Sequence, residues 1–182
     1  ILFAGLFVNA QDVAKGLVYE DTNKNGILDR KEKGLPNVLV SNGVDIAKTN
    51  AKGEYEITVT DETILFVIKP SNYQLSVLKD QLPQSYYIHK PNGSPELKYG
   101  GSKPTGKLPK SVNFGLIPTS EGKEFSALVF GDPQAYNLEE VDYFAKGIVD
   151  ELKGVKNMVF GISLGDLVGD DLVLHPDYKN AI

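Results

Sequence analysis

Two acidic segments each follow an apolar run typical of a buried strand. Asp132 lies just after residues 125–130, within Gly-Asp-Pro-Gln, and Asp166 just after residues 158–164, within Gly-Asp-Leu-Val-Gly-Asp-Asp. In an open parallel sheet, ligands gather outside the carboxyl ends of the strands. Two carboxylates brought that close together repel each other unless cations compensate their charge. The sequence therefore predicts a pair of divalent metal ions at this edge, bridged by Asp166.

A second set of oxygen side chains lies in residues 21–32. Oxygen-bearing side chains occupy positions 1, 3, 5, 9 and 12 of this loop, and glycine occupies position 6, where a sharp turn is needed. A hard cation needs six to eight oxygen ligands, and alternate residues of a tight loop can point inward together. The pattern predicts a structural calcium site with side-chain ligands and one backbone carbonyl, from Asp21, Asn23, Asn25, Ile27, Asp29 and Glu32.

The segments around this loop differ from a helix–loop–helix hand. Residues 15–20 are typical of a strand, and Gly34-Leu35-Pro36 follows the loop. Residues 15–55 resemble the B-type Ig-like repeats of bacterial surface proteins, in which such loops hold structural calcium. The alternative is a polar turn rich in Asp and Asn that binds no ion.

The elements that position these groups fall into two patterns. Up to about Pro118, short runs rich in β-branched and aromatic residues alternate with turn signals, which predicts a β-sandwich. The expected strands are 13–19, 38–41, 45–49, 55–59, 64–69 and 111–117, and the Pro-rich stretch 82–110 is expected to be a long irregular arm.

The pattern changes after Lys123. The apolar runs 125–130 and 158–164 predict strands buried on both faces, and the spacing of apolar residues in 137–152 predicts a helix between them. The predicted fold is thus an all-β Ig-like sandwich followed by the start of an α/β domain with a βαβ unit. The predicted parts are a signal-peptide remnant at residues 1–10, the sandwich at 11–118, a linker at 119–123 and the incomplete second domain at 124–182.

Composition and the N-terminal residues indicate an exported protein. The net charge of −5 and the scattered Lys and Arg residues give no nucleic-acid-binding signature, and the absence of cysteine excludes disulfides and zinc–thiolate sites. Residues 1–10 look like the end of a signal peptide, with a buried first strand as the alternative. The apolar run is too short to span a bilayer. We therefore expect a bacterial periplasmic, cell-surface or secreted protein.

The two acidic segments and their order resemble the calcineurin-like metallophosphoesterases. Asp132 matches the first Asp of that family's Asp-x-His motif, and Asp166 matches the metal-bridging Asp of its Gly-Asp motif. Gln134 stands where the common pattern has His, so one metal site is expected to be atypical. The resemblance implies that Asp132 and Gln134 bind one of two metals (Mn, Fe or Zn), that Asp166 binds both, and that Asp170 either lies near them or caps the next turn.

The resemblance also implies a function: metal-dependent hydrolysis of a phosphomonoester or phosphodiester substrate. The family's remaining ligands and general acid are expected beyond Ile182, so we expect this chain alone to be an inactive N-terminal fragment. Its two histidines match none of the family's later motifs: His89 is expected to be solvated, and His175 to begin or cap a helix. The alternative function is a calcium-stabilised Ig-like surface module that binds glycan or protein without catalysis.

Overall fold

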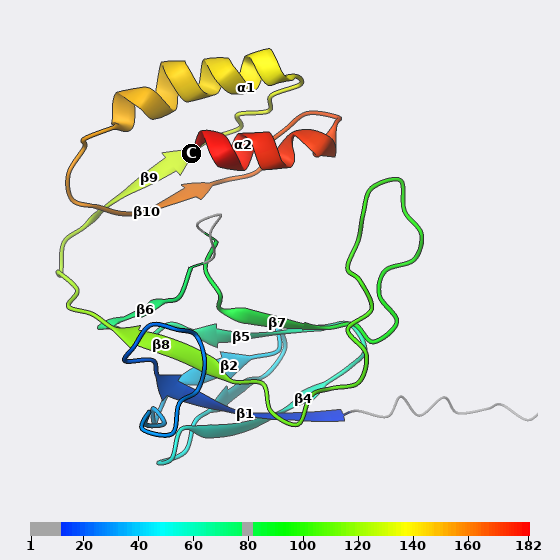
Figure 1. The fold of residues 1–182 in the computed structure, drawn as a ribbon, viewed down its shortest axis with the longest axis vertical. Coiled ribbons are helices and arrows are strands. Elements are labelled where there is room, and N and C mark those ends of the chain that lie inside the picture. The colour runs from blue at the N-terminus through cyan, green and yellow to red at the C-terminus, as the bar shows by residue number, and fades with distance from the viewer. Residues whose placement is uncertain (1–11, 78–81) are drawn as a thin grey trace, which may run out of the picture. The chain divides into compact units, whose positions relative to one another are not determined.

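The computed structural model describes residues 12–77 and 82–182. The predicted signal-peptide remnant at residues 1–10 lies outside these ranges. The chain divides into two compact units, residues 1–121 and 122–182, and each is described by itself (Figure 1). Within the described ranges, no helix has the length and apolar character needed to cross a membrane.

The first unit contains two four-stranded sheets. One has the strand order β4-β1-β8-β6 and the other β3-β2-β5-β7. The pairing of β1 with β8 is parallel, and the other pairings are antiparallel. The strands are β1 (Asp12–Glu20), β2 (Leu39–Ser41), β3 (Ile46–Lys48), β4 (Glu54–Val59), β5 (Thr63–Ile68), β6 (Tyr73–Leu75), β7 (Tyr86–His89) and β8 (Phe114–Pro118).

The two sheets share one hydrophobic core. Alternate residues of β4 (Tyr55, Ile57 and Val59) are buried, and the alternation in β5 buries Leu65 and Val67 in the same cluster. This period of two is what a strand with one face on a core requires. Burial alternates in both strands, but only the sequence of β4 alternates between polar and apolar residues, whereas β5 is apolar at nearly every position.

Backbone packing beside β1 depends on Gly16. A Cβ built on Gly16 would lie 1.7 Å from the carbonyl oxygen of Val112. The segment around Val112 could therefore not lie so close to β1 if any residue other than glycine stood at position 16. The Tyr55 hydroxyl donates to the same Val112 oxygen at 2.7 Å, and burial raises the pKa of Tyr55. These contacts fix the chain just before β8 against β1.

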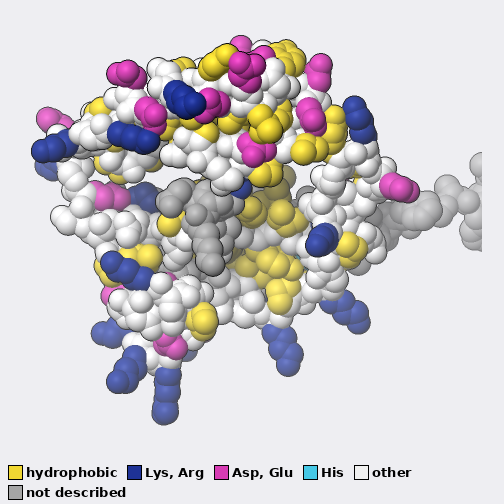
Figure 2. Space-filling model, turned by 45° about the horizontal axis from the view of Figure 1, so that its top comes forward, with side chains coloured by type: hydrophobic (Ala, Val, Ile, Leu, Met, Phe, Trp, Pro, Cys, Tyr) yellow, Lys and Arg dark blue, Asp and Glu magenta, His cyan; other side chains and the backbone are white. Residues whose placement is uncertain are grey.

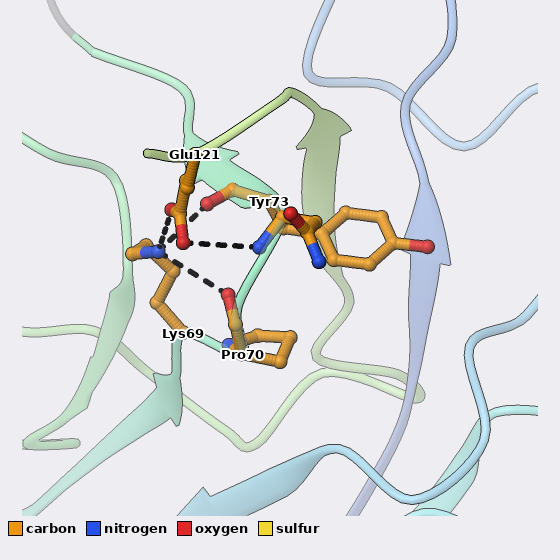
Figure 3. A network of polar contacts seen from close by, with 5 residues as sticks. Lys69, Pro70, Tyr73 and Glu121 are labelled. Atoms are coloured by element: carbon orange, nitrogen blue, oxygen red, sulfur yellow. Dashed lines mark hydrogen bonds and ion pairs between the residues drawn. The ribbon is translucent and has the colours of Figure 1, made fainter. Parts of the chain in front are cut away.

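A polar network fixes the last residues of the first unit (Figure 3). The Lys69 ammonium donates to the carbonyl oxygens of Pro70 and Tyr73, at 3.2 and 2.8 Å, and forms an ion pair with Glu121. The other Glu121 oxygen accepts a hydrogen bond from the Asn72 backbone N–H at 3.0 Å. All three ammonium protons of Lys69 can thus be used at once. The segment that follows β8 is held against the β5–β6 connection up to Glu121.

The second unit contains a βαβ arrangement. β9 (Ser126–Phe130) and β10 (Met158–Ser163) pair in parallel, and α1 (Leu138–Phe144) lies between them in the sequence. The helical chain continues after α1 as a π-helical turn at Ala145–Val149 and a 3₁₀ turn at Asp150–Leu152. A further 3₁₀ turn at Leu172–Leu174 precedes α2 (His175–Ala181), which begins at His175 as expected.

Local sequence signals account for the start and the packing of α1. The Asn137 side chain accepts from the backbone N–H of Glu140 at 2.9 Å, which is an N-cap of the usual kind. Phe144, at the end of α1, packs between Phe130 of β9 and Tyr178 of α2, with ring centroids 5.5 and 5.1 Å apart. The two helices thus cover one face of the two strands.

The prediction that both strands are buried on both faces is wrong for the described residues. Val129 of β9 is 60% exposed, and Phe160 and Ile162 of β10 are 52% and 46% exposed. The reason is that α1 and α2 pack on the side of Phe130 and Ser163, whereas Val129 and Ile162 point to the other side.

Two further expectations are corrected in the first unit. His89 is 1% exposed rather than solvated, because β7 places it opposite Thr63 of β5, and its ring stacks on Tyr87. The stretch 82–110 is not entirely irregular, since it contains β7. The strand β6 also lies outside the predicted set.

Candidate metal centre

The predicted metal ligands follow two neighbouring parallel strands. Ser163 at the end of β10 is in register with Phe130 at the end of β9, so the connections that leave both strands start at the same edge. The Leu164 backbone N–H donates to the Phe130 carbonyl oxygen at 3.0 Å, which extends this pairing by one residue. The loops that contain Asp132 and Asp166 therefore begin side by side.

The two loops are joined by backbone hydrogen bonds. The Gln134 N–H donates to the carbonyl oxygen of Asp166 at 2.7 Å, and the Gly169 N–H donates to Ala135 at 2.7 Å. Ala135 and Val168 form a parallel bridge. The result is a short ribbon that brings Gln134 next to Asp166, with Asp132 two residues before Gln134. The structure thus brings the loops of all three sequence-predicted residues together.

All three residues have an unusual backbone conformation. The φ angles of Asp132, Gln134 and Asp166 are 23°, 40° and 39°. Residues other than glycine rarely adopt positive φ, and Asn and Asp tolerate it best. In the described ranges, Gln134 and Lys24 are the only residues other than Gly, Asn and Asp that have positive φ. Backbone strain of this kind persists where the surrounding structure imposes it, and it gathers at functional sites.

The side chains of the centre are accessible. Asp132 and Asp166 are exposed and Gln134 is half-buried. Asp170 is also exposed, whereas Asp171 accepts from the Val173 backbone N–H at 3.0 Å and caps the following turn. The second unit carries five Lys against eleven Asp and Glu, a formal charge of −6, and acidic side chains are prominent on it in Figure 2. An anionic substrate would be repelled by this unit unless bound cations reversed the local charge.

No three His, Cys, Asp or Glu side chains are grouped closely enough to hold a metal ion in the part of the chain that the structure describes. Asp132, Gln134 and Asp166 by themselves offer fewer ligands than two metal ions need. Carboxylate and amide oxygens are donors of the kind that Mg, Ca and Mn take.

The loop at residues 21–32 forms a second candidate site, organised around Asp21. Asp21 is fully buried, and its two carboxylate oxygens accept from the backbone N–H groups of Asn25 and Gly26 at 3.1 and 2.8 Å. The Glu32 carboxylate accepts from the backbone of Thr22 at 3.0 Å and Asp29 at 2.9 Å. Both ends of the loop are thus closed by carboxylates at its first and last positions.

Three more predicted ligands meet inside the loop. The amide nitrogens of Asn23 and Asn25 both donate to one oxygen of Asp29, at 2.6 and 2.9 Å. The orientation of an Asn amide follows from its hydrogen-bond partners. Turning both amides would direct two amide oxygens at the Asp29 carboxylate, an arrangement that requires a cation between them. Ile27 donates its backbone N–H to the Asn25 side chain at 2.8 Å.

The negative charge of this loop affects the pKa of the Tyr19 hydroxyl. The pKa of the Tyr19 hydroxyl is raised to about 12, first by burial and then by the nearby carboxylates of Asp21, Glu32 and Asp29. A phenol is harder to ionise where negative charge is already present. The same negative potential favours a cation in the loop.

One contact beside the candidate ligands is not signalled by the sequence. The ring of Tyr136 lies against Gly169, where a Cβ would be 2.4 Å from a ring carbon. No local pattern signals this contact, because it depends on the pairing of two loops that are far apart in the chain.

Comparison with known families places a match in the first unit. Residues 22–99 match the family described as N terminal of Calcineurin-like phosphoesterase. The predicted relationship to calcineurin-like phosphoesterases is therefore supported. The matched residues are fewer than half of the chain and do not include Asp132, Gln134 or Asp166. No curated protein matches the chain.

The similarity of this chain to a solved structure is weaker than its match to the family model. The crystal structure of GBS52, the minor pilin in the gram-positive pathogen Streptococcus agalactiae, is 14% identical and has a TM-score of 0.33. The match covers 64% of this chain and 48% of the pilin chain, so the chain spans about half of that protein. Likeness at this level supports no inference about fold or function.

Proposed function

We propose that the protein containing this chain is a metal-dependent phosphoester hydrolase with a two-metal centre. The observation that carries the proposal is the joining of the Gln134 and Asp166 loops at the ends of two parallel strands, with Asp132, Gln134 and Asp166 all held at positive φ. The family match at residues 22–99 supports the same activity.

The three residues have separate roles in this proposal. Asp132 and Gln134 would hold one metal through carboxylate and amide oxygens, and Asp166 would be a ligand shared with the second metal. The amide is a weaker ligand than the imidazole common in the family, so the first site binds its metal less tightly. Divalent metals such as Mn, Fe or Zn, once bound, supply a hydroxide nucleophile and neutralise the charge on the phosphoryl group.

The test is metal-dependent cleavage of p-nitrophenyl phosphate and bis-p-nitrophenyl phosphate by the full-length protein. Asp166→Asn keeps the size of the side chain and removes its charge, and we expect it to lower kcat/KM by at least about a hundredfold, a change that corresponds to loss of a main catalytic group. Asp150→Asn is the matched control, because Asp150 pairs with Lys153 on the surface of the same unit. If Asp166→Asn hydrolyses both esters as fast as the control, Asp166 is not a metal bridge.

We also propose that the loop at residues 21–32 binds calcium and that the first unit is an Ig-like module of an exported bacterial protein. The buried Asp21 and the convergence of Asn23 and Asn25 on Asp29 support a cation here. This calcium is structural, because it ties the loop ends together and lies in the unit that does not contain Asp132 and Asp166. The same observations favour the second candidate function, a calcium-stabilised surface module, if the hydrolase test fails.

The calcium proposal is tested by thermal unfolding. Calcium at a hundred times its Kd stabilises a protein by about 2.7 kcal/mol. We expect millimolar calcium to raise the Tm by about 10 °C, and this rise to disappear in Asp21→Asn but not in Asp61→Asn, a change at an exposed turn. An equal rise in both variants would show that calcium acts elsewhere.

A further inference from the structure

A cavity lies along one side of the first unit. Its volume is about 450 Å³, a size found in sites for small molecules. Tyr86 and Tyr87 of the edge strand β7 line it, and so do residues of the stretch 109–115 that leads into β8. β6 pairs with β8 only from Leu116 onward, so within the described residues no strand covers the side of 112–115 that faces away from β1. The cavity is thus lined by strand edges that remain open.

The lining of this cavity carries no charge. Among the described residues that line it there are aromatic rings, prolines, hydroxyls and amides but no Asp, Glu, Lys, Arg or His, although 24% of the chain is charged. An ionic ligand would lose its hydration here without gaining a counter-charge. The cavity therefore suits a neutral ligand, in contrast to the anionic phosphoester proposed for the second unit.

Several polar groups of the lining are available to a ligand. Within the described residues, the hydroxyls of Tyr86 and Tyr87 and the amide of Gln84 form no hydrogen bond. The Asn113 amide oxygen accepts from a backbone N–H of β1 at 3.0 Å and from the Ser111 hydroxyl at 2.6 Å. These two bonds fix the orientation of the Asn113 amide and leave its NH₂ group as a donor. The lining thus offers both donors and acceptors to a ligand rich in hydroxyl groups.

The two tyrosines also supply apolar surface. The Tyr86 side chain is 52% exposed, and Tyr87 is half-buried with its ring stacked on His89. Such rings pack against a flat apolar group while their hydroxyls remain free to hydrogen-bond. A sugar ring has a flat face of C–H groups and a rim of hydroxyls, so it matches both parts of the lining. A purely apolar ligand would leave the amides of Gln84 and Asn113 unpaired, which is unfavourable.

We propose that this cavity is a binding site for a neutral carbohydrate, which packs on Tyr86 and hydrogen-bonds to Gln84 and Asn113. The described lining residues all belong to the first unit. The inference therefore does not depend on the hydrolase function proposed for the second unit, and it gives the first unit a role in attaching the protein to a glycan.

The test is isothermal titration calorimetry of the full-length protein with cellohexaose, maltohexaose, xylohexaose and N-acetylchitohexaose. Hexagalacturonate tests for an anionic sugar, and decaproline tests for an extended peptide, since Pro-rich peptides also dock on aromatic grooves. Tyr86→Leu removes the ring and keeps apolar bulk, and Gln84→Ala removes an amide. Tyr143→Leu is the matched control, because Tyr143 is 60% exposed and belongs to the second unit.

We expect at least one neutral hexasaccharide to bind, and to bind about tenfold more weakly to Tyr86→Leu and Gln84→Ala but equally well to Tyr143→Leu. Binding of none of the four neutral sugars overturns the inference, as does tighter binding of hexagalacturonate or decaproline. Affinity that stays unchanged in both cavity variants places the sugar elsewhere and also overturns it. Gln84→Ala changes an exposed side chain, so it decides the matter if Tyr86→Leu does not fold.

Discussion

Replacement of Gln134 by glycine should stabilise the second unit and abolish the function of the centre. Gln134 has a φ of 40°. Its side chain is half-buried, and within the described residues it forms no hydrogen bond to the core. The left-handed conformation costs an L-residue roughly 1–2 kcal/mol. Glycine avoids this cost but loses about 0.5–1 kcal/mol of additional chain entropy on folding. The expected net gain is about 1 kcal/mol, which for a unit of this size raises the Tm by about 4–8 °C.

The assay is thermal unfolding of the metal-free protein, followed by hydrolysis of a nitrophenyl ester by the metal-loaded protein. Ala135→Gly is the matched control, because Ala135 is the next residue, lies in the same ribbon and does not have a positive φ. We expect this control to lower stability by about 0.5–1 kcal/mol. A variant that gains stability while losing activity is the signature of strain maintained for function.

The reasoning is refuted if Gln134→Gly is destabilised as much as Ala135→Gly. That outcome would mean that the positive φ at Gln134 carries no strain. It would remove the backbone argument for a functional site and leave only the sequence resemblance.

Two further predictions concern the first unit. The hydrogen bond and ion pair with Lys69 lower the pKa of Glu121, so this contact stabilises the unit above the ordinary carboxyl pKa of 4.5, and the stabilisation is lost as the pH falls through the lowered pKa. Glu121→Gln should therefore be less stable than the wild-type protein at pH 7 and equally stable near pH 2. A stability difference that stays constant across this pH range in urea unfolding would count against the ion pair. Gly16→Ala should destabilise the unit by about 3 kcal/mol or prevent folding, because the added Cβ would lie 1.7 Å from the Val112 carbonyl oxygen and such overpacking is costly. A variant with the wild-type Tm would show that the 111–113 segment is not held against Gly16.

Six strands of the first unit could be predicted from short runs of β-branched and aromatic residues and from turn signals, whereas β6 and β7 could not. β6 is only three residues long, and β7 is a Tyr-Tyr-Ile-His segment inside a stretch rich in Pro and Gly. Its strand conformation depends on pairing with β5. Nothing local to residues 86–89 signals that partner, and the burial of His89 depends on the same pairing.

The second unit shows the same limit. Apolar spacing predicts the helix after Asn137, but no local signal indicates its change to a π-helical turn at Ala145. The run 158–164 is apolar throughout, and composition alone cannot tell whether helices cover one face of a strand or both. Only the structure shows that α1 and α2 pack on the Phe130 side.

The candidate ligands Asp132 and Asp166 could be chosen from the sequence because a turn follows each predicted strand. The pairing of their loops could not, because it depends on hydrogen bonds between residues far apart in the chain, such as that between Gln134 and Asp166, and no local pattern signals the positive φ angles. The same holds for the contact of Tyr136 with Gly169.

The most direct test of the central claim is the number of divalent metal ions bound per chain of the full-length protein, measured by elemental analysis after loading with Mn, Fe or Zn. A bridging role for Asp166 predicts two ions in the wild-type protein, loss of tight binding at both positions in Asp166→Asn, and two ions in Asp150→Asn. Two tightly bound ions in Asp166→Asn would contradict the metal centre proposed at the ends of β9 and β10.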